Sequence, residues 1–257
     1  MKDKEISSRL FLHLFYFYAM QKKLYLLDAM ALVFRAYYAL IRSPRITSKG
    51  RNTNSQFGFT NTLIDLINNQ KPTHMAVCFD THAPTERHVD FADYKANRQE
   101  APEDIISAIP DIKRIIEGFN IPVVELDGYE ADDALGMNQT KDTIICSIDK
   151  DLDMIPGNHY NFVKDIHYEV NEDEAIRNFY KQMLTGDRVD NIIGIRGIGP
   201  VKASKLLDTC KTELEMYNVC VKAYNDAGED GVQRVTENGK LLWLLRTKDQ
   251  VWSPPLA

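Results

Sequence analysis

The chain has 257 residues, of which 44% are hydrophobic and 26% are charged. This composition excludes a disordered chain, a collagen-like chain and a bundle of membrane-spanning helices. The formal net charge of −6 also argues against a protein that coats DNA through uniform positive charge. The charge is uneven, because residues 1–51 carry 10 basic and 3 acidic side chains whereas residues 99–191 carry 8 and 21. We therefore expect a carboxylate-rich centre between less acidic flanks.

Short apolar runs alternate with helical patterns along the first two thirds of the chain. Strands are predicted at residues 23–27, 74–79, 121–126 and 143–148, with further short strands at 161–164 and 167–170. Helices are predicted at residues 30–41, 56–69, 103–119, 130–136 and 172–184. This alternation predicts an α/β fold with a central, mostly parallel sheet flanked by helices.

The sequence pattern changes at Gly194, where a glycine-rich turn leads into Pro200 at the expected start of a helix. Helices are predicted at residues 200–207, 212–227 and 231–244. We therefore divide the chain into an α/β core at 20–191 and a helical subdomain at 192–257. The apolar stretch 10–20 is too short to span a bilayer, and the missing cleavage motif disfavours a signal peptide. Residues 1–19 are interpreted as an extension upstream of a natural start at Met20, because the first predicted strand begins directly after that methionine.

The four cysteines form neither a C-x-x-C pair nor a zinc-binding pattern. Cys78 and Cys146 lie in apolar strand-like runs, which favours buried free thiols. Free thiols are typical of a reducing compartment, so we expect a cytoplasmic protein that does not associate with membranes.

Acidic residues follow the predicted strands and recur in tight clusters. Because ligands of open α/β sheets bind beyond the carboxyl ends of the strands, these acids are expected to converge at one edge. A single acidic doublet is most often a solvated turn or helix start, but the ordered combination is far more specific. Gathered carboxylates repel one another, and hard divalent cations such as Mg²⁺ offset that repulsion. The acids are Asp28, Asp80, Glu130, Asp132, Asp133, Asp149, Asp151, Asp187 and Asp190.

Several motifs together resemble the 5′ nuclease superfamily. This family comprises flap endonucleases and 5′→3′ exonucleases, including the N-terminal domain of bacterial DNA polymerase I and stand-alone phage exonucleases. The resemblance covers roughly residues 22–210. The motifs that carry it are Leu26-Leu27-Asp28-Ala29, Phe34-Arg35-Ala36-Tyr37, Ala76-Val77-Cys78-Phe79-Asp80, Tyr94-Lys95-Ala96-Asn97-Arg98, Glu130-Ala131-Asp132-Asp133, Asp149-Lys150-Asp151, Gly186-Asp187-Arg188-Val189-Asp190-Asn191 and the turn from Gly194 to Pro200.

The resemblance implies a divalent-metal-dependent enzyme that hydrolyses DNA phosphodiester bonds. Two or more Mg²⁺ ions, for which Mn²⁺ can substitute, would activate water and stabilise the leaving oxygen. Asp28, Asp80, Glu130, Asp132 and Asp133 would build one part of the metal centre. The remaining acids, at 149, 151, 187 and 190, would build the other. The substrates implied are DNA with 5′ ends, flaps or junctions, and we expect a monomer.

The resemblance also implies a helical arch at about residues 81–102, with Lys95 stabilising the charge of the scissile phosphate. Arg98 and Arg35 would add cationic contacts near the reacting phosphate. Tyr94 is expected to stack on a base. Taken alone, a lysine such as Lys95 is usually a solvated surface residue, and the flanking motif is what favours a catalytic role.

Duplex DNA would be held through its backbone, so recognition should follow shape more than base sequence. The glycine-rich turn resembles the helix–turn–helix-type element of these nucleases, in which K⁺ often binds. The loop after the first helix offers a basic ridge, although a solvated loop would look the same. The expected DNA contacts are Gly197, Gly199, Lys202, Lys205, Arg42, Arg45 and Lys49.

Asp133 and Asp149 are only 16 positions apart, whereas the family usually has a longer helix between these motifs. Because of this departure, one alternative function is that of a family relative that binds junction DNA but has weakened catalysis. A PIN-like ribonuclease is a second alternative, which the glycine-rich turn disfavours. An unrelated Mg²⁺ phosphatase is a third, for which a partner motif to Asp151-Leu152-Asp153 is missing.

Overall fold

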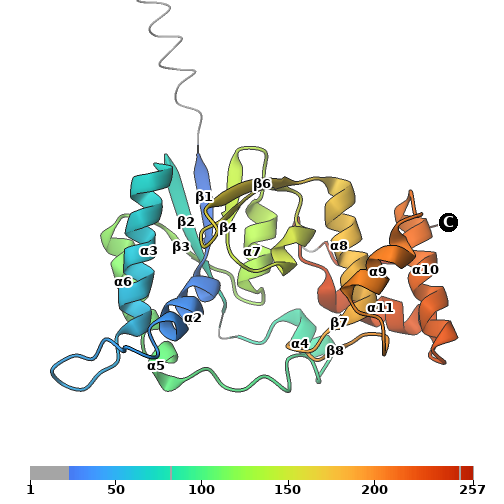
Figure 1. The fold of residues 1–257 in the computed structure, drawn as a ribbon, viewed down its shortest axis with the longest axis horizontal. Helices are drawn as coiled ribbons and strands as arrows, with labels where there is room; N and C mark the ends of the chain where they lie inside the picture. The colour runs from blue at the N-terminus through green and yellow to red at the C-terminus, as the bar shows by residue number, and fades with distance from the viewer. Residues whose placement is uncertain (1–22, 82, 249, 257) are drawn as a thin grey trace, which may run out of the picture.

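The computed structural model describes residues 23–81, 83–248 and 250–256, so the extension predicted at 1–19 lies outside the described residues. A six-stranded sheet occupies the centre of the molecule (Figure 1). Its order is β3-β2-β1-β4-β5-β6, and every neighbouring pair is parallel except β5 and β6. The predicted α/β class with a mostly parallel sheet is therefore confirmed. The strands are β1 (Leu24–Asp28), β2 (His74–Phe79), β3 (Val123–Glu125), β4 (Thr143–Cys146), β5 (Gly157–Asn161) and β6 (Ile166–Val170).

The strand order reverses at β1, which lies between β2 and β4. In register, Asp28 pairs with Cys78 of β2, and Leu27 pairs with Cys146 of β4. The residues that follow these strands, Asp80 and Ser147, therefore leave the sheet at the same edge as Asp28. In open α/β sheets this edge, at the point of reversal, is the usual ligand site.

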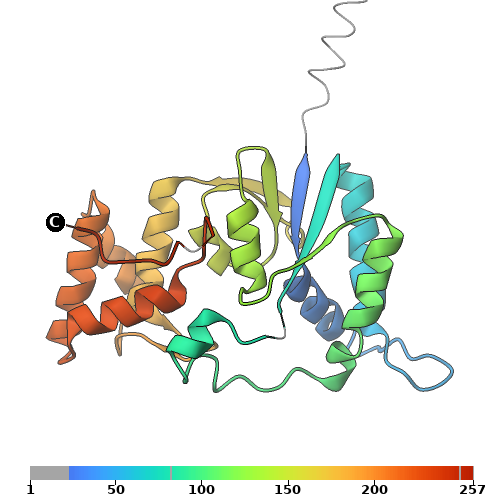
Figure 2. The ribbon, with the colours of Figure 1, turned by 180° about the vertical axis from the view of Figure 1, so that it is seen from behind.

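Helices cover both faces of the sheet (Figures 1 and 2). On one face, Tyr25 and Leu27 of β1 are buried against Phe59 and Leu63 of α3. On the other face, Leu26 belongs to a separate cluster with Leu135 and its neighbours on α7. Alternate residues of a strand point to opposite faces, so the uninterrupted apolar run of β1 fits a strand that is buried on both sides. The first face is covered by α2 (Ala29–Ala39), α3 (Asn54–Gln70), α5 (Glu103–Ile106) and α6 (Ile109–Gly118), and the second by α7 (Ala131–Asn138).

The C-terminal part is helical, as predicted, and packs around a second core containing Phe179, Tyr180 and Tyr224. A separate two-stranded hairpin, β7–β8, connects α8 to α9. The short α4 (Glu86–Asp90) lies below the sheet edge in Figure 1. The remaining elements are the 3₁₀ turn η1 (Asp151–Met154), α8 (Glu172–Thr185), β7 (Gly186–Asp187), β8 (Ile192–Ile193), α9 (Pro200–Leu207), α10 (Glu213–Asp226) and α11 (Gly231–Leu242).

Three segments differ from their predictions. The helix predicted at 103–119 is split into α5 and α6, because Pro110 at the start of α6 has no N–H to continue a helix. The strand predicted at 161–164 overlaps β5 only at Asn161, and residues 162–165 form the turn of the β5–β6 hairpin. There the Asn161 side chain accepts hydrogen bonds from the backbone N–H groups of Val163 and Lys164. The arch segment 81–102 is helical only at α4 in its described part.

Cys78 and Cys146 are buried and unpaired, as predicted, and so are Cys210 and Cys220. No helix in the described ranges is long and apolar enough to cross a membrane.

Candidate active site

Asp28 and Asp80 lie at the carboxyl ends of β1 and β2, and each side chain accepts a hydrogen bond from the N-terminus of a helix. Asp28 Oδ1 accepts a hydrogen bond of 3.0 Å from the Ala31 N–H in the first turn of α2. Its Oδ2 accepts one of 2.6 Å from the Ser147 hydroxyl at the end of β4. Asp80 Oδ1 accepts one of 2.8 Å from the Ala131 N–H at the start of α7. The free N–H groups of helix N-termini thus fix both carboxylates.

The carboxylates at this edge act on one another electrostatically. Burial raises the pKa of Asp28 to about 6, and the charges of Asp149 and Asp80 add to the rise, against the hydrogen bonds from Ser147 and Ala31. Burial also raises the pKa of Asp132 well above its usual range, with further contributions from Asp28, Asp149 and Asp80. We call Asp28, Asp80, Asp132 and Asp149 the strand-end cluster.

A second acidic group adjoins this cluster at η1 and the β7–β8 hairpin. Burial, followed by the charge of Asp149, raises the pKa of Asp151 to about 7, and Asp187 and Asp190 contribute too. Gln182 of α8 donates hydrogen bonds to Asp151 (3.2 Å) and Asp187 (3.3 Å). Asp187 Oδ1 accepts from the Asp190 N–H at 3.3 Å, which shapes the hairpin loop. The two acidic groups therefore meet at Asp149.

Cations of the segment after α4 reach into the acidic centre. Lys95 Nζ forms an ion pair with Glu130 and lies 3.8 Å from Asp190 Oδ2. Arg98 Nε donates to Asp190 Oδ1 at 3.0 Å. The backbone of Lys95 has a φ of 57°, and its N–H donates to the Asp190 carbonyl at 3.0 Å. A left-handed lysine is uncommon, and this backbone contact holds it in place.

Tyr94 lies inside the protein instead of at its surface. The side chain belongs to the second core and the residue is only 5% exposed. Its hydroxyl donates to Glu130 at 3.1 Å and to Asp190 at 3.3 Å. This burial argues against the predicted stacking of Tyr94 on a base, because the ring presents no free face.

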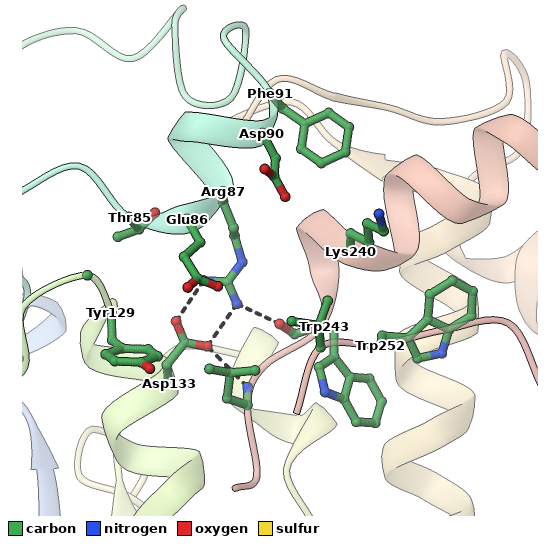
Figure 3. A pocket seen from close by; sticks show the side chains of 13 residues that line it. Thr85, Glu86, Arg87, Asp90, Phe91, Tyr129, Asp133, Lys240, Trp243 and Trp252 are labelled. Atoms are coloured by element: carbon green, nitrogen blue, oxygen red, sulfur yellow. Dashed lines mark hydrogen bonds and ion pairs between the residues drawn. The ribbon is translucent and has the colours of Figure 1, made fainter. Parts of the chain in front are cut away.

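Asp133 faces away from the strand-end cluster. Its two carboxylate oxygens accept hydrogen bonds of 2.7 and 2.8 Å from Arg87 of α4, and Oδ1 also accepts one of 3.1 Å from the Leu245 N–H. Figure 3 shows Arg87 between Asp133 and the Trp243 carbonyl, at the wall of a small cavity. Successive helix residues point in directions about 100° apart, and here Asp133 is turned toward Arg87 and Leu245 while Asp132 is turned toward the rest of the strand-end cluster.

The other residues predicted to contact DNA are at the surface. Arg35 of α2 and Lys150 line a groove beside Asp149. Gly197 and Gly199 line another groove, which also includes Asn97 and Asp187. The remaining predicted contacts are exposed on α9 or on the loop between α2 and α3: Lys202, Lys205, Arg42, Arg45 and Lys49.

The donor chemistry fits a hard divalent cation. Burial and the charges of neighbouring carboxylates raise the pKa of Asp28 and Asp132, and a cation of charge two would offset the repulsion between these carboxylates. Within residues 23–81, 83–248 and 250–256, however, no three His, Cys, Asp or Glu side chains stand in ready metal-binding geometry. The fit therefore rests on donor type and electrostatics.

Three polar residues of this region were not among the site residues predicted from the sequence. Ser147 supports Asp28, Gln182 bridges Asp151 and Asp187, and Arg87 binds Asp133. Ser147 could have been found from its place at the carboxyl end of β4, two residues before Asp149. Gln182 and Arg87 depend on contacts with residues distant in the chain.

Comparison with known proteins decides the family. Residues 23–182 match the model of the 5′-3′ exonuclease, N-terminal resolvase-like domain. The chain belongs to the 5′-3′ exonuclease family. This membership confirms the predicted resemblance to 5′ nucleases, and with it the prediction of a DNA-hydrolysing enzyme.

Relatives of this nuclease include a 5′-3′ exonuclease of Aquifex aeolicus, which is 37% identical over 201 residues. That match covers 72% of this chain and 69% of the relative. DNA polymerase I of Caldicellulosiruptor bescii is 32% identical over 76% of this chain, and that of Borreliella burgdorferi is 36% identical over 77%. The matches cover 25% and 24% of these polymerases, so the nuclease spans about a quarter of their length.

Solved structures share the fold of this nuclease at low sequence identity. Phage T5 5′-exonuclease with bound divalent zinc ions has a TM-score of 0.68 and 18% identity, and the match covers 86% of this chain and 89% of that one. The catalytic core of Rad2 in complex with a DNA substrate has a TM-score of 0.52 and 17% identity, over 82% of this chain and 67% of that one.

Proposed function

We propose that this chain is a divalent-metal-dependent 5′→3′ exonuclease and flap endonuclease that hydrolyses DNA. The strand-end cluster carries the proposal, because Asp28, Asp80, Asp132 and Asp149 share one edge of the sheet. Burial, together with the charges of Asp149 and Asp80, raises the pKa of both Asp28 and Asp132. Such a group is stabilised by bound cations. The solved T5 exonuclease, which shares the fold, was studied with divalent zinc.

The proposed metal ligands fall into two groups that meet at Asp149. Bound Mg²⁺, or Mn²⁺ in its place, would supply an activated water and stabilise the leaving oxygen of the phosphodiester. Asp133 is better explained as a support for α7, since Arg87 and Leu245 occupy its oxygens. The proposed ligands are Asp28, Asp80, Glu130 and Asp132 in the first group, and Asp149, Asp151, Asp187 and Asp190 in the second.

Lys95 and Arg98 are proposed to hold the scissile phosphate and to offset its negative charge. Their cationic groups lie against Glu130 and Asp190, next to the acidic centre. A fixed cation stabilises charge that develops on phosphate oxygens in the transition state. Arg35, which lines the groove beside Asp149, would contact an adjoining phosphate.

The proposed DNA surface runs from this centre to the glycine-rich turn and α9. Gly199 and Pro200 begin α9, whose N-terminus favours an anion, and Lys202 and Lys205 are exposed on the same helix. We extend the proposal to K⁺ at the turn, to contacts from Arg42, Arg45 and Lys49, and to a helix–turn–helix-type role for this region. DNA with 5′ ends, flaps or junctions is the proposed substrate of a cytoplasmic monomer.

Cleavage of a 5′-labelled flap substrate, with Mg²⁺ and with chelator, tests the proposal. Short labelled products are expected only with Mg²⁺, and Asp149→Ala is expected to abolish cutting while retaining DNA binding and the circular dichroism of the parent. A folded parent protein that binds the flap but leaves it intact with Mg²⁺ would support a binding relative instead. Preferential cutting of a matched RNA flap would support the ribonuclease alternative.

A further inference from the structure

The segment after α11 runs back to the nuclease core and crosses α7. We call residues 243–248 the C-terminal strap; it is the dark red segment that approaches α7 in Figure 2. Leu244 is buried in the cluster that contains Leu135 of α7. At the crossing, a Cβ on Gly136 would lie 2.3 Å from the Leu245 carbonyl oxygen. The strap and α7 therefore touch at backbone level, and a glycine is needed where they cross.

Both ends of the strap are fastened to the rest of the molecule. The Trp243 ring meets Phe179 of α8 edge-on, with 5.3 Å between ring centroids. The Arg246 guanidinium lies 4.8 Å from the centroid of the Trp243 ring and donates to the Met154 carbonyl at 3.0 Å. Because these contacts are made with α8 and η1, the position of the strap is fixed relative to those two elements, and a group that binds the strap is fixed relative to them as well.

Arg87, which lies on α4, links the strap to α7. Its guanidinium donates to Asp133 at 2.7 and 2.8 Å, to the Trp243 carbonyl at 2.5 Å and to Glu130 at 3.4 Å. Asp133 in turn accepts from the N–H groups of Leu245 (3.1 Å) and Glu130 (3.2 Å). The Arg87 side chain is 10% exposed and the Asp133 side chain 2%. Because the Arg87 guanidinium and the Asp133 carboxylate are planar and share two parallel hydrogen bonds, both their separation and their relative orientation are fixed.

We propose that Arg87 and Asp133 are positioning residues for the nuclease reaction. Together with the strap they fix the first turn of α7, and with it the Glu130 and Asp132 carboxylates, relative to the segment that carries Lys95. The helix α7 spans only eight residues, and a helix that short has little stability of its own. Its orientation therefore depends on contacts such as these. The inference rests on the function proposed above.

Two substitutions separate a positioning role from mere structural support. Arg87→Lys keeps the charge but loses the fork, and Asp133→Asn keeps the shape but loses the charge. Lys240→Ala is the matched control, because Lys240 lines the same cavity and makes none of these hydrogen bonds. Each protein is assayed for kcat and KM on the flap substrate, for Mn²⁺ binding by calorimetry without DNA, and for Tm.

Both substitutions are expected to lower kcat and Mn²⁺ affinity by about 10- to 100-fold, with KM little changed, as for other residues that orient metal ligands. Lys240→Ala should match the parent. A lower Tm with parental kcat and Mn²⁺ affinity in either variant overturns the proposal, and if one variant does not fold the other decides. In the parent, fast hydrogen exchange at the Leu245 amide also overturns it. An inactive parent instead overturns the proposed function.

Discussion

Ser147 donates a hydrogen bond of 2.6 Å to Asp28 across the boundary between β4 and β1. The bond spans the point where the strand order reverses. It favours the ionised form of Asp28, which is a buried carboxylate of the strand-end cluster. A neutral hydroxyl thus helps to keep a buried carboxylate charged and ready for a cation.

Replacing Ser147 by alanine is expected to shift the pH dependence of cleavage. Loss of the hydrogen bond raises the pKa of Asp28 further above about 6, so the acidic limb of the rate profile should move to higher pH. Profiles of kcat/KM from pH 5 to 9 measure the shift. Thr143→Val removes a buried hydroxyl at the other end of β4 and should leave the profile unchanged; equal shifts in both variants would contradict the assignment.

The metal-free protein is expected to become less stable as pH rises. The carboxyls of Asp28 and Asp151 have pKa values raised to about 6 and about 7, above their ordinary value of 3.8. The folded state therefore binds more protons than the unfolded state between about pH 4 and 7, and stability falls through this window as pH increases. Each unit of pKa difference corresponds to about 1.4 kcal/mol.

Thermal unfolding in chelator at pH 5.5 and 8 checks this expectation, and Tm should be lower at pH 8. Added Mg²⁺ should remove most of the difference, because a cation binds the ionised carboxylates. Asp151→Asn should flatten the dependence even without metal. A Tm in chelator that rises between these pH values would refute the account.

Removing the bridge between Asp151 and Asp187 should weaken catalysis. Gln182→Leu takes away both hydrogen bonds, so the two carboxylates are held less firmly and kcat should fall by about 10- to 100-fold. Steady-state cleavage at saturating Mg²⁺ measures the loss. Lys181→Ala serves as the control, because Lys181 directly precedes Gln182 on α8 and its side chain donates to Asn178 instead of to Asp151 or Asp187. Equal activity of both variants and the parent would count against the bridge.

Local patterns were sufficient to predict most of the sheet. The apolar run 74–79 coincides with β2, and the short runs at 23–27 and 143–148 overlap β1 and β4, because buried parallel strands read as continuous apolar segments. Residues 162–164, predicted as part of a strand, belong to the hairpin turn, since the side-chain hydrogen bonds of Asn161 outweigh the apolar character of Phe162 and Val163.

The acidic centre was predictable in outline because parallel strands bring their carboxyl ends to one edge. Adjacent helical residues such as Asp132 and Asp133 point in different directions, however, and the contact of Asp133 with Arg87 was not predictable from the motif. The burial of Tyr94 and the contacts of Arg87 arise from packing between segments far apart in the sequence. Neither residue type nor spacing predicts such contacts.

The double variant Lys202→Ala/Lys205→Ala should weaken DNA binding without slowing the chemical step. Both lysines are exposed on α9, and loss of two phosphate contacts should reduce the slope of log K against log salt by about 2. Binding titrations at several salt concentrations measure the slope, while single-turnover cleavage at saturating protein should keep the parental rate. Lys222→Ala, on the exposed surface of α10, controls for charge. An unchanged slope would exclude α9 from the DNA surface.

Replacing Gly136 by alanine should separate the strap from α7. The added Cβ would lie 2.3 Å from the Leu245 carbonyl oxygen, so the backbones must move apart at a cost of about 1–3 kcal/mol in the free energy of unfolding. Denaturant unfolding measures the loss. Gly118→Ala, in the last turn of α6, is the matched control: its Cβ would meet no atom within 4 Å, and alanine there should be neutral or favourable by up to about 1 kcal/mol. If the strap holds α7 as its contacts indicate, only Gly136→Ala should also accelerate amide exchange at Leu245, and similar effects of both substitutions would mean that the crossing is not a close contact.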